Sequence, residues 1–282
     1  MSEREAAPTV VPERGSHNLL MRVAAASVLA PLAIAAAYAG GWLWSALVTL
    51  AAVGLYLEWL TVVGAAHEIR VTVSGSVALA IAGWYLAADQ ITVSLAALAL
   101  GLAVVVLLSP QRRYWTAAGF LYAAAAQMAS VLVRLDQAYG FVALIFVLLV
   151  VWVSDIGGYV AGRGIGGPKL WPRVSPKKTW AGAVGGFSGS LVIAAGFAAF
   201  GFGKPLPLLV LAAILSVASQ LGDLFESAVK RRFGVKDSSH IIPGHGGLMD
   251  RLDGYVAAIL LAAIFGILRG GTDSIGRALM IW

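Results

Sequence analysis

The sequence predicts an all-α integral membrane protein with about nine transmembrane helices. Of its 282 residues, 60% are hydrophobic and 12% are charged, whereas a soluble domain carries about 25% charged residues. The mean hydropathy of +0.85 agrees with a membrane protein. The apolar residues also gather in runs close to the ~20 residues that a helix needs to cross a bilayer. Composition and run length together indicate a chain that crosses the membrane repeatedly.

The chain divides into two regions. Residues 1–18 are polar and lack an apolar period, so they are expected to form a disordered N-terminal tail. Residues 19–282 are expected to form a single polytopic membrane domain. Its predicted spans cover residues 19–40, 41–64, 71–88, 91–109, 114–133, 140–160, 180–203, 206–229 and 254–268. The first run exceeds the ~7–15 apolar residues of a signal peptide, so a retained span is expected there.

The basic side chains predict which loops face the cytoplasm. Most of them lie in alternate loops, namely 65–70, 110–113, 161–179 and 230–253. The remaining loops between spans hold only Arg134 and Lys204. Because Lys and Arg are enriched in cytoplasmic loops, this asymmetry predicts a cytoplasmic N-terminus and a cell-membrane protein whose long polar loops face the cytoplasm. The C-terminal tail, with Arg269 and Arg277, would lie outside and fits the rule least well.

Composition and the spacing of small residues narrow the possibilities further. The chain has no cysteine, which excludes disulfides and thiolate metal sites. The net charge of +6 does not indicate nucleic-acid binding, because the basic residues sit in short loops between apolar runs. That pattern is typical of topology signals and of contacts with anionic membrane lipids. In span 180–203, Gly182-x-x-x-Gly186 and Gly185-x-x-x-Gly189 predict close helix packing.

The polar stretch 220–253 stands out from the apolar remainder. Asp223, Glu226, Ser227 and Lys230 follow one another at i, i+3, i+4 and i+7, so a helix places them on one face. A carboxylate within a span costs roughly 2.5–3.5 kcal/mol on insertion scales. Asp223 is therefore expected to face the protein interior or water and to have a cation as partner. For Glu226, an ion pair with Lys230 on the same helix is the simpler interpretation.

A glycine-rich turn and two aspartates follow. Pro243-Gly244-His245-Gly246-Gly247 disfavours a helix, permits positive φ, and can turn backbone N–H groups toward an anion. Asp250 and Asp253 then share one face at the start of the last span, where the helix dipole would keep them ionised. Helix capping accounts for one of these aspartates but not for both together with Asp223.

Carboxylates on two helix ends beside a basic, glycine-containing loop suit Mg²⁺, which takes one or two carboxylates and completes its shell with water and phosphate oxygens. We therefore expect a Mg²⁺ site formed by Asp223, Asp250 and Asp253. Phosphoryl transfer depends mainly on positioning and charge neutralisation, so this set of residues is sufficient for it.

A second polar patch follows span 140–160. It contains Asp155, a turn expected at Ser175-Pro176, and Lys177 and Lys178 at the entrance to the next span. The two lysines can be read as topology signals or as phosphate-binding groups. Residues 162–167 match G-x-G-x-x-G, but no βαβ unit surrounds them, which excludes a dinucleotide site.

These residues resemble the signature of the phosphatidate cytidylyltransferase family. The matching elements are Ser227, Lys230-Arg231, Lys236-Asp237, the turn 243–247, Asp250-Arg251 and Asp253, together with Asp155 and Ser175-Pro176-Lys177-Lys178-Thr179. The resemblance covers roughly residues 152–254. One departure is Ala181-Gly182, where the family commonly has Glu-Gly.

The resemblance implies that CTP and phosphatidic acid react to give CDP-diacylglycerol and pyrophosphate with Mg²⁺, in an enzyme that forms a homodimer. It implies catalytic roles for Asp223, Asp250, Ser227 and Lys230. It implies substrate binding by Lys177, Lys178, Arg231, Lys236, His245, Arg251 and Asp155. Ser227 is expected to be a ligand or an orienting group rather than a nucleophile. His245 is expected either to donate to a phosphate oxygen or to stabilise its turn.

Two alternatives stay open at this point. One is a CTP-dependent enzyme with another lipid acceptor, such as an isoprenoid phosphate or alcohol. The other is a cation-coupled transporter whose carboxylates carry the ion. Against the transporter, the charged residues gather at one membrane face, whereas transporter sites lie near the middle of the bilayer.

Overall fold

The computed structural model describes residue 27, residues 30–239 and residues 246–282. Eight of its helices are long and apolar enough to cross a membrane, which confirms the all-α membrane class. They are α2 (Gly41–Val62), α3 (Ile69–Ala87), α4 (Ile91–Leu108), α5 (Arg113–Leu135), α6 (Gly140–Gly164), α7 (Trp180–Ala199), α8 (Pro205–Arg232) and α9 (Met249–Gly270). The short helix Ala30–Ala39 covers the later part of the expected first span. Residues 1–18 and most of 19–29 lie outside the described residues, so the tail, the count of nine and the orientation stay predictions.

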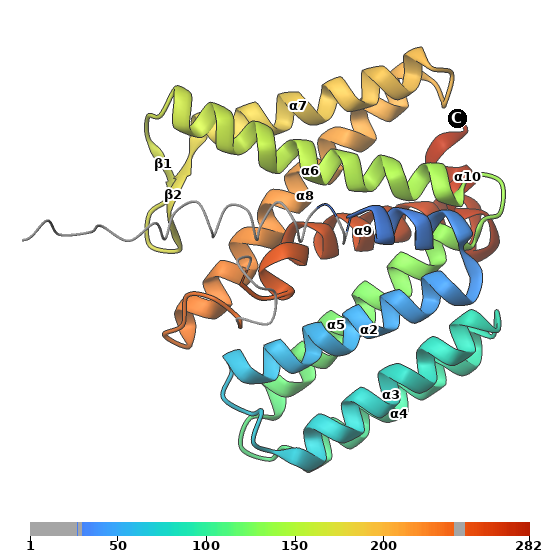
Figure 1. Ribbon diagram of the computed structural model, residues 1–282, viewed down its shortest axis with the longest axis vertical. Coiled ribbons are helices and arrows are strands. Elements are labelled where there is room, and N and C mark those ends of the chain that lie inside the picture. Colours follow the sequence, from blue (N-terminus) through green and yellow to red (C-terminus); the bar gives the residue numbers. More distant parts are fainter. Residues whose placement is uncertain (1–26, 28–29, 240–245) are drawn as a thin grey trace, which may run out of the picture.

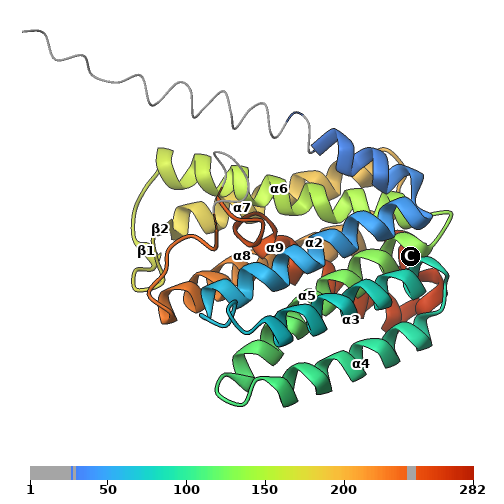
Figure 2. The ribbon, with the colours of Figure 1, turned by 60° about the horizontal axis from the view of Figure 1, so that its bottom comes forward.

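Helix α9 occupies the centre of the bundle. It packs against α8 and α5, and also against α6, α2 and α10 (Ile275–Met280). Figure 1 shows α9 between α8 and α5, with the α6–α7 pair on one side and the α3–α4 pair on the other. In Figure 2, α4 forms the outer edge of the molecule. One buried apolar cluster surrounds Phe146, Leu215 and Ile259, and a second surrounds Tyr56 and Phe120.

Helices α6 and α7 pack closely because glycines line their contact. A Cβ atom at Gly186 would lie 2.4 Å from the carbonyl oxygen of Ser154, and one at Gly182 would lie 2.7 Å from that of Gly158. The Ser190 hydroxyl adds a hydrogen bond of 3.1 Å to the carbonyl of Val150. The packing role predicted for these glycines is confirmed.

A short hairpin that the sequence analysis missed connects α6 to α7. Strand β1 (Lys169–Trp171) pairs antiparallel with β2 (Ser175–Thr179). The turn expected at Ser175-Pro176 is wrong, because residues 172–174 make the turn and Ser175 begins β2. A two-stranded hairpin tolerates proline, since each strand has one edge that needs no donor. The Thr179 hydroxyl then caps α7 by accepting from the Gly182 N–H at 3.1 Å.

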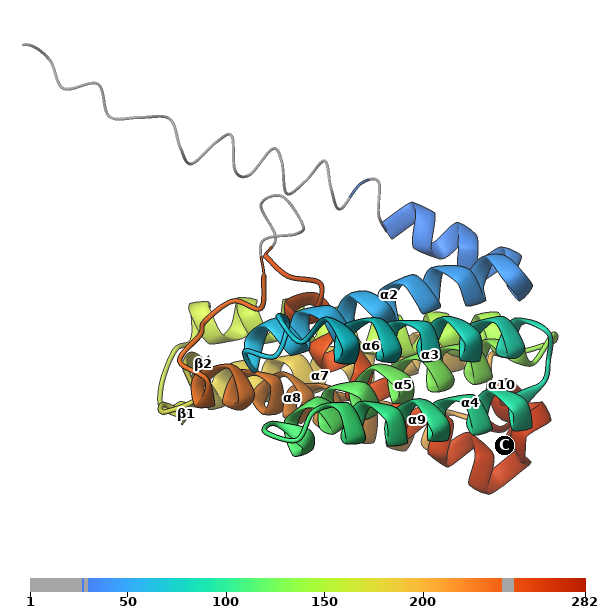
Figure 3. The same cartoon turned by 90° about the horizontal axis from the view of Figure 1, so that it is seen from below.

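The two ends of the bundle differ in character. The polar end comprises the last turns of α2, α6 and α8, the hairpin, and the first turns of α7 and α9. At the opposite end, η1 (Thr272–Ser274) and α10 (Ile275–Met280) fold back onto the bundle. Figure 3 shows β1, β2 and α8 at one end and α10 at the other. The chain thus gathers its conspicuous polar motifs at one end.

The glycine contact predicts opposite effects for two alanine substitutions in α7. Gly186→Ala should lower stability by about 1–3 kcal/mol, because its Cβ meets backbone that cannot give way. Gly196→Ala is the matched control, since nothing lies within 4 Å of a Cβ there. It should leave stability unchanged or raise it by up to about 1 kcal/mol. Thermal unfolding in detergent measures both, and equal Tm values for the two variants would contradict the packing model.

Candidate functional site

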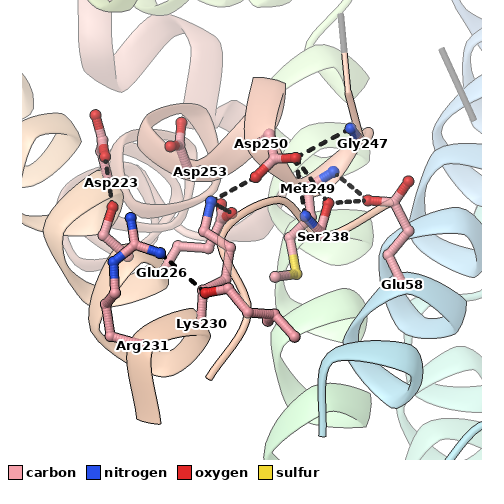
Figure 4. A network of polar contacts seen from close by, with 12 residues as sticks. Glu58, Asp223, Glu226, Lys230, Arg231, Ser238, Gly247, Met249, Asp250 and Asp253 are labelled. Carbon is pink, nitrogen blue, oxygen red and sulfur yellow. Dashed lines mark hydrogen bonds and ion pairs between the residues drawn. The ribbon is translucent and has the colours of Figure 1, made fainter. Parts of the chain in front are cut away.

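The polar end contains two groups of interacting side chains. We call Asp155, Asp223, Asp253 and Lys178 the acidic group, and Glu58, Lys230, Ser238 and Asp250 the loop anchor. In the view of Figure 4, Asp253 lies between Asp223 and Asp250, and Glu58 approaches Ser238 and Met249 from the far side.

Lys178 and Asp223 join β2 to α8 at the acidic group. Their side chains form an ion pair, and each is a little over a quarter exposed. Side chains alternate along a strand, so Lys178 points inward while the neighbouring Lys177 is exposed. The Ser227 hydroxyl donates to Oδ1 of Asp223 at 3.3 Å. The expectation of a cation partner for Asp223 is thereby confirmed, and the role predicted for Ser227 stays a prediction.

Asp155 and Asp253 bring two further carboxylates to the acidic group. Asp155 comes from α6 and Asp253 from α9, and both lie within electrostatic range of Asp223 and of Lys178. Arg251 also lies within range of Asp155. Lys178 and Arg251 together can neutralise only two of the three negative charges, so the group favours binding of a further cation.

The donor set of the acidic group fits Mg²⁺ in particular. In the described part of the chain, no group of three or more acidic or histidine side chains is placed so that it could hold a metal ion by itself. Mg²⁺ does not require one, because one or two carboxylates suffice when waters and substrate phosphates supply the other ligands. Asp223 and Asp253 can provide those carboxylates from two separate helices.

Asp250 is already held by protein donors. Its Oδ1 pairs with Lys230, and its Oδ2 accepts from the N–H groups of Ser238 and Gly247, each at 3.0 Å. The Ser238 hydroxyl lies 3.1 Å from the same Oδ2. Lys230 and the two N–H groups occupy three of the roughly four acceptor positions of the carboxylate, because the single Ser238 hydroxyl proton can go to Asp250 or to Glu58 but not to both. A metal ion bound by Asp250 would compete with the Lys230 ammonium for this carboxylate, and the predicted ligand set divides between the two groups.

Lys230 links α8 to the start of α9. It forms the expected ion pair with Glu226 one turn away, at 2.8 Å, as well as the pair with Asp250. Glu226 is fully buried and Lys230 nearly so. The ammonium group is thus shared by two protein carboxylates.

Glu58 of α2 is a component of the site that the sequence analysis missed. Its carboxylate is buried and accepts from the N–H groups of Leu248 and Met249 at 2.8 and 2.7 Å. It also accepts from the hydroxyls of Ser238 and Ser239 at 2.8 and 2.6 Å. Glu58 is the only charged residue in the predicted span 41–64. The insertion-cost argument applied to Asp223 would have identified it.

The glycines before α9 are explained by this arrangement. A Cβ at Gly247 would lie 1.8 Å from the Ser238 hydroxyl oxygen and 2.6 Å from Oε2 of Glu58, so no side chain fits. Gly246 has a φ of +82°, a conformation that glycine adopts readily. The rest of the predicted turn, including His245, lies outside the described residues, and its proposed anion contacts stay predictions.

The remaining predicted substrate-binding residues lie on the surface of the polar end. Lys177, Arg231, Lys236 and Arg251 are exposed. Arg231 donates to the carbonyl of Val235 at 2.9 Å, which shapes the chain after α8. Together with Lys178 they give the acidic group a basic surround that can accept a multiply charged anion.

Comparison with known proteins matches residues 20–268 to the model of the Cytidylyltransferase family. A phosphatidate cytidylyltransferase of Brucella suis biovar 1 (strain 1330) is 38% identical over 263 residues, which covers 91% of this chain and 96% of the relative. A protein of the same name from Bacillus subtilis (strain 168) is 45% identical over 126 residues, 44% of this chain and 46% of the relative. The one from Staphylococcus saprophyticus is 48% identical over 124 residues, 43% of this chain and 47% of the relative.

The loop anchor predicts that Glu58→Gln loosens the start of α9. Hydrogen bonds to a charged group contribute about 1.5–3 kcal/mol, so the amides of Leu248 and Met249 should exchange about tenfold faster or more. Hydrogen–deuterium exchange of a peptide spanning 246–253 measures this. Glu68→Gln, just before α3, is the matched control and should leave that peptide unchanged. Unaltered protection in Glu58→Gln would contradict the anchoring role.

Proposed function

The chain belongs to the cytidylyltransferase family and is a nucleotidyltransferase of the membrane, and we propose that it transfers the cytidylyl group of CTP to phosphatidic acid. The products are CDP-diacylglycerol, a precursor for phospholipid synthesis, and pyrophosphate. Support for these substrates comes from the relatives named phosphatidate cytidylyltransferase, one of which matches almost the whole chain. The basic loops support a site that faces the cytoplasm, where CTP is available.

We propose Mg²⁺ as the cofactor, with Asp223 and Asp253 as its protein ligands and Asp155 as a further source of negative charge. When bound, Mg²⁺ would neutralise phosphate charge and polarise the α-phosphate. Asp250 stays a predicted ligand, for which Mg²⁺ would compete with the Lys230 ammonium. A homodimer also stays a prediction.

The reaction requires two anions to meet. A phosphate oxygen of phosphatidic acid attacks the α-phosphorus of CTP, the bond to the β-phosphate oxygen breaks, and pyrophosphate leaves. The attacking oxygen is already anionic, so the site needs no strong general base. Lys178, Arg231 and Arg251 can offset the triphosphate and lipid charges, and the surface residues Lys177 and Lys236 extend this basic surround.

One observation carries the proposal. Carboxylates from α6, α8 and α9 converge beside Lys178 at the polar end, in a chain whose family transfers cytidylyl groups. Their charges are only partly neutralised within the protein. A bound cation would complete the site, and negatively charged substrates would complete the cation's shell.

The proposed reaction is tested by pyrophosphate release from purified protein in detergent. Release should require CTP, phosphatidic acid and Mg²⁺ together, so that leaving out any one abolishes it. EDTA should stop the reaction and added Mg²⁺ should restore it. Replacing phosphatidic acid with an isoprenoid phosphate or alcohol separates the proposal from the alternative acceptor. Release with those acceptors but not with phosphatidic acid would refute the proposed substrate.

The metal assignment predicts different responses from three aspartates. Asp223→Asn and Asp253→Asn should each lower kcat by about 100-fold or more, because they remove charge beside the reacting phosphates. Asp250→Asn should also lower kcat, but it should speed amide exchange in 246–253, which the other two should not. Asp273→Asn, exposed at the opposite end, is the control. Full activity in Asp223→Asn and Asp253→Asn would eliminate the assignment.

A further inference from the structure

A cavity that the proposed reaction does not use lies where the first turn of α2 meets the last turns of α3 and α5. This is the end of the bundle opposite the acidic group, the end that carries α10 in Figure 3. The cavity volume is about 350 Å³, within the roughly 300–1,000 Å³ of small-molecule sites. All three helices contribute apolar side chains to its lining, among them Trp44, Leu86 and Val131. Two charged side chains, Asp89 and Arg134, complete it.

Arg134 presents to the cavity a guanidinium group that the protein positions but does not neutralise. Its Nε–H donates to the carbonyl of Ala37, and an Nη2–H donates to the carbonyl of Tyr38. These carbonyls belong to the last turn of the short helix Ala30–Ala39, so two of the five N–H donors of the guanidinium cap that helix. None of the ion pairs among the described residues involves Arg134. The group therefore retains donors and a positive charge for an anion.

Asp89 occupies a position where both its conformation and its charge disfavour the fold. It is the only non-glycine residue with positive φ in the part of the chain that the structure describes, at +58°. Its N–H donates to the carbonyl of Leu86 at 3.1 Å, and the N–H of Gln90 donates to that of Tyr85 at 2.8 Å, which is a Schellman end to α3. Glycine or asparagine is usual there, and a negative charge opposes the helix dipole. A residue that costs stability twice while lining a cavity indicates a binding role.

Exposed aromatic side chains place this cavity at the level of lipid head groups. Trp42 and Trp84 are at least half exposed, and their ring centroids are 4.6 Å apart. Trp42 follows the cavity residue Gly41, and Trp84 precedes the cavity residue Leu86 by less than one turn. Tyr38, which accepts from Arg134, is exposed as well. Because Trp and Tyr gather where the membrane meets water, the ligand that reaches this cavity is expected to come from the bilayer.

We propose that this cavity binds the head group of a zwitterionic phospholipid, with the phosphate at Arg134 and the ammonium at Asp89. The two side chains line one cavity and form no ion pair with one another, so a ligand that carries both charges complements them. A purely anionic lipid would satisfy Arg134 but would be repelled by Asp89. The apolar part of the lining accommodates the beginning of the acyl chains.

This lipid is a structural ligand and not a reactant. It binds at the end of the bundle opposite the acidic group, so the inference does not depend on the proposed function. A phosphate at Arg134 would fix the guanidinium that caps the helix Ala30–Ala39, just before the two positive-φ glycines Gly40 and Gly41. Since only the folded protein offers this site, the bound lipid should raise the Tm.

Native mass spectrometry of the delipidated full-length protein tests the class of ligand. Phosphatidylethanolamine should bind with a Kd about fivefold or more below that of phosphatidylglycerol with the same acyl chains, because only the former offers an ammonium to Asp89. Equal or tighter binding of phosphatidylglycerol would overturn the proposal. Glycerophosphoethanolamine has the same head group without acyl chains and should bind more weakly than phosphatidylethanolamine. Equal affinity for it would show a site for a soluble zwitterion and would overturn the lipid assignment.

Asp89→Asn isolates this cavity from other lipid contacts. Asparagine also adopts positive φ, so the fold should be kept, and the Tm without added lipid should be unchanged or higher because the helix dipole no longer meets a negative charge. The preference for phosphatidylethanolamine should disappear. Asp273→Asn, exposed at the same end and outside the cavity, is the matched control and should keep it. A preserved preference in Asp89→Asn, or a lower Tm without lipid, would refute the binding role of this carboxylate.

Discussion

Carboxylates placed inside an apolar bundle constrain the whole polar end of this protein. Each such charge is costly unless donors or cations reach it, and the donors come from segments far away in the sequence. Glu58 of α2 accepts from the chain just before α9, 190 residues further on. Lys178 of the hairpin reaches Asp223 of α8. These contacts fix α2 relative to the start of α9, and the hairpin relative to α8.

The same constraint distinguishes the loop anchor, which holds the chain in place, from the acidic group, which can bind a further cation. In the loop anchor, Glu58 and Asp250 each accept several hydrogen bonds and Lys230 is shared between Glu226 and Asp250. Such a network is stiff, because loss of any member leaves a buried charge uncompensated. The acidic group is different, since its three carboxylates outnumber the two cations within electrostatic range, Lys178 and Arg251. Residual charge of this kind is costly for stability and useful for binding, which is typical of a functional site.

The position of α9 connects this charge to the membrane. Its first turn provides Asp250 to the anchor, its second turn provides Asp253 to the acidic group, and the same face continues as the floor of an apolar groove. A water-soluble nucleotide and a lipid need to approach one point from different phases. Helix α9 begins at the polar end and continues along the apolar groove between α5 and α8, so one helix contacts both surroundings.

The sequence by itself determined the membrane class, the approximate limits of the eight described spans and the local pairs. Span length and hydropathy are properties of contiguous residues, and Glu226 and Lys230 meet because one helical turn separates them. Tertiary structure decided which partners the other charges have. Asp250 and Asp253 share a helical face, yet one turns to Lys230 and Ser238 while the other turns to Asp223. How the helices pack also determines where the hairpin places Lys178 and which groups donate to Glu58. Contacts between distant segments have no periodic pattern in the sequence, so they could not be predicted from it.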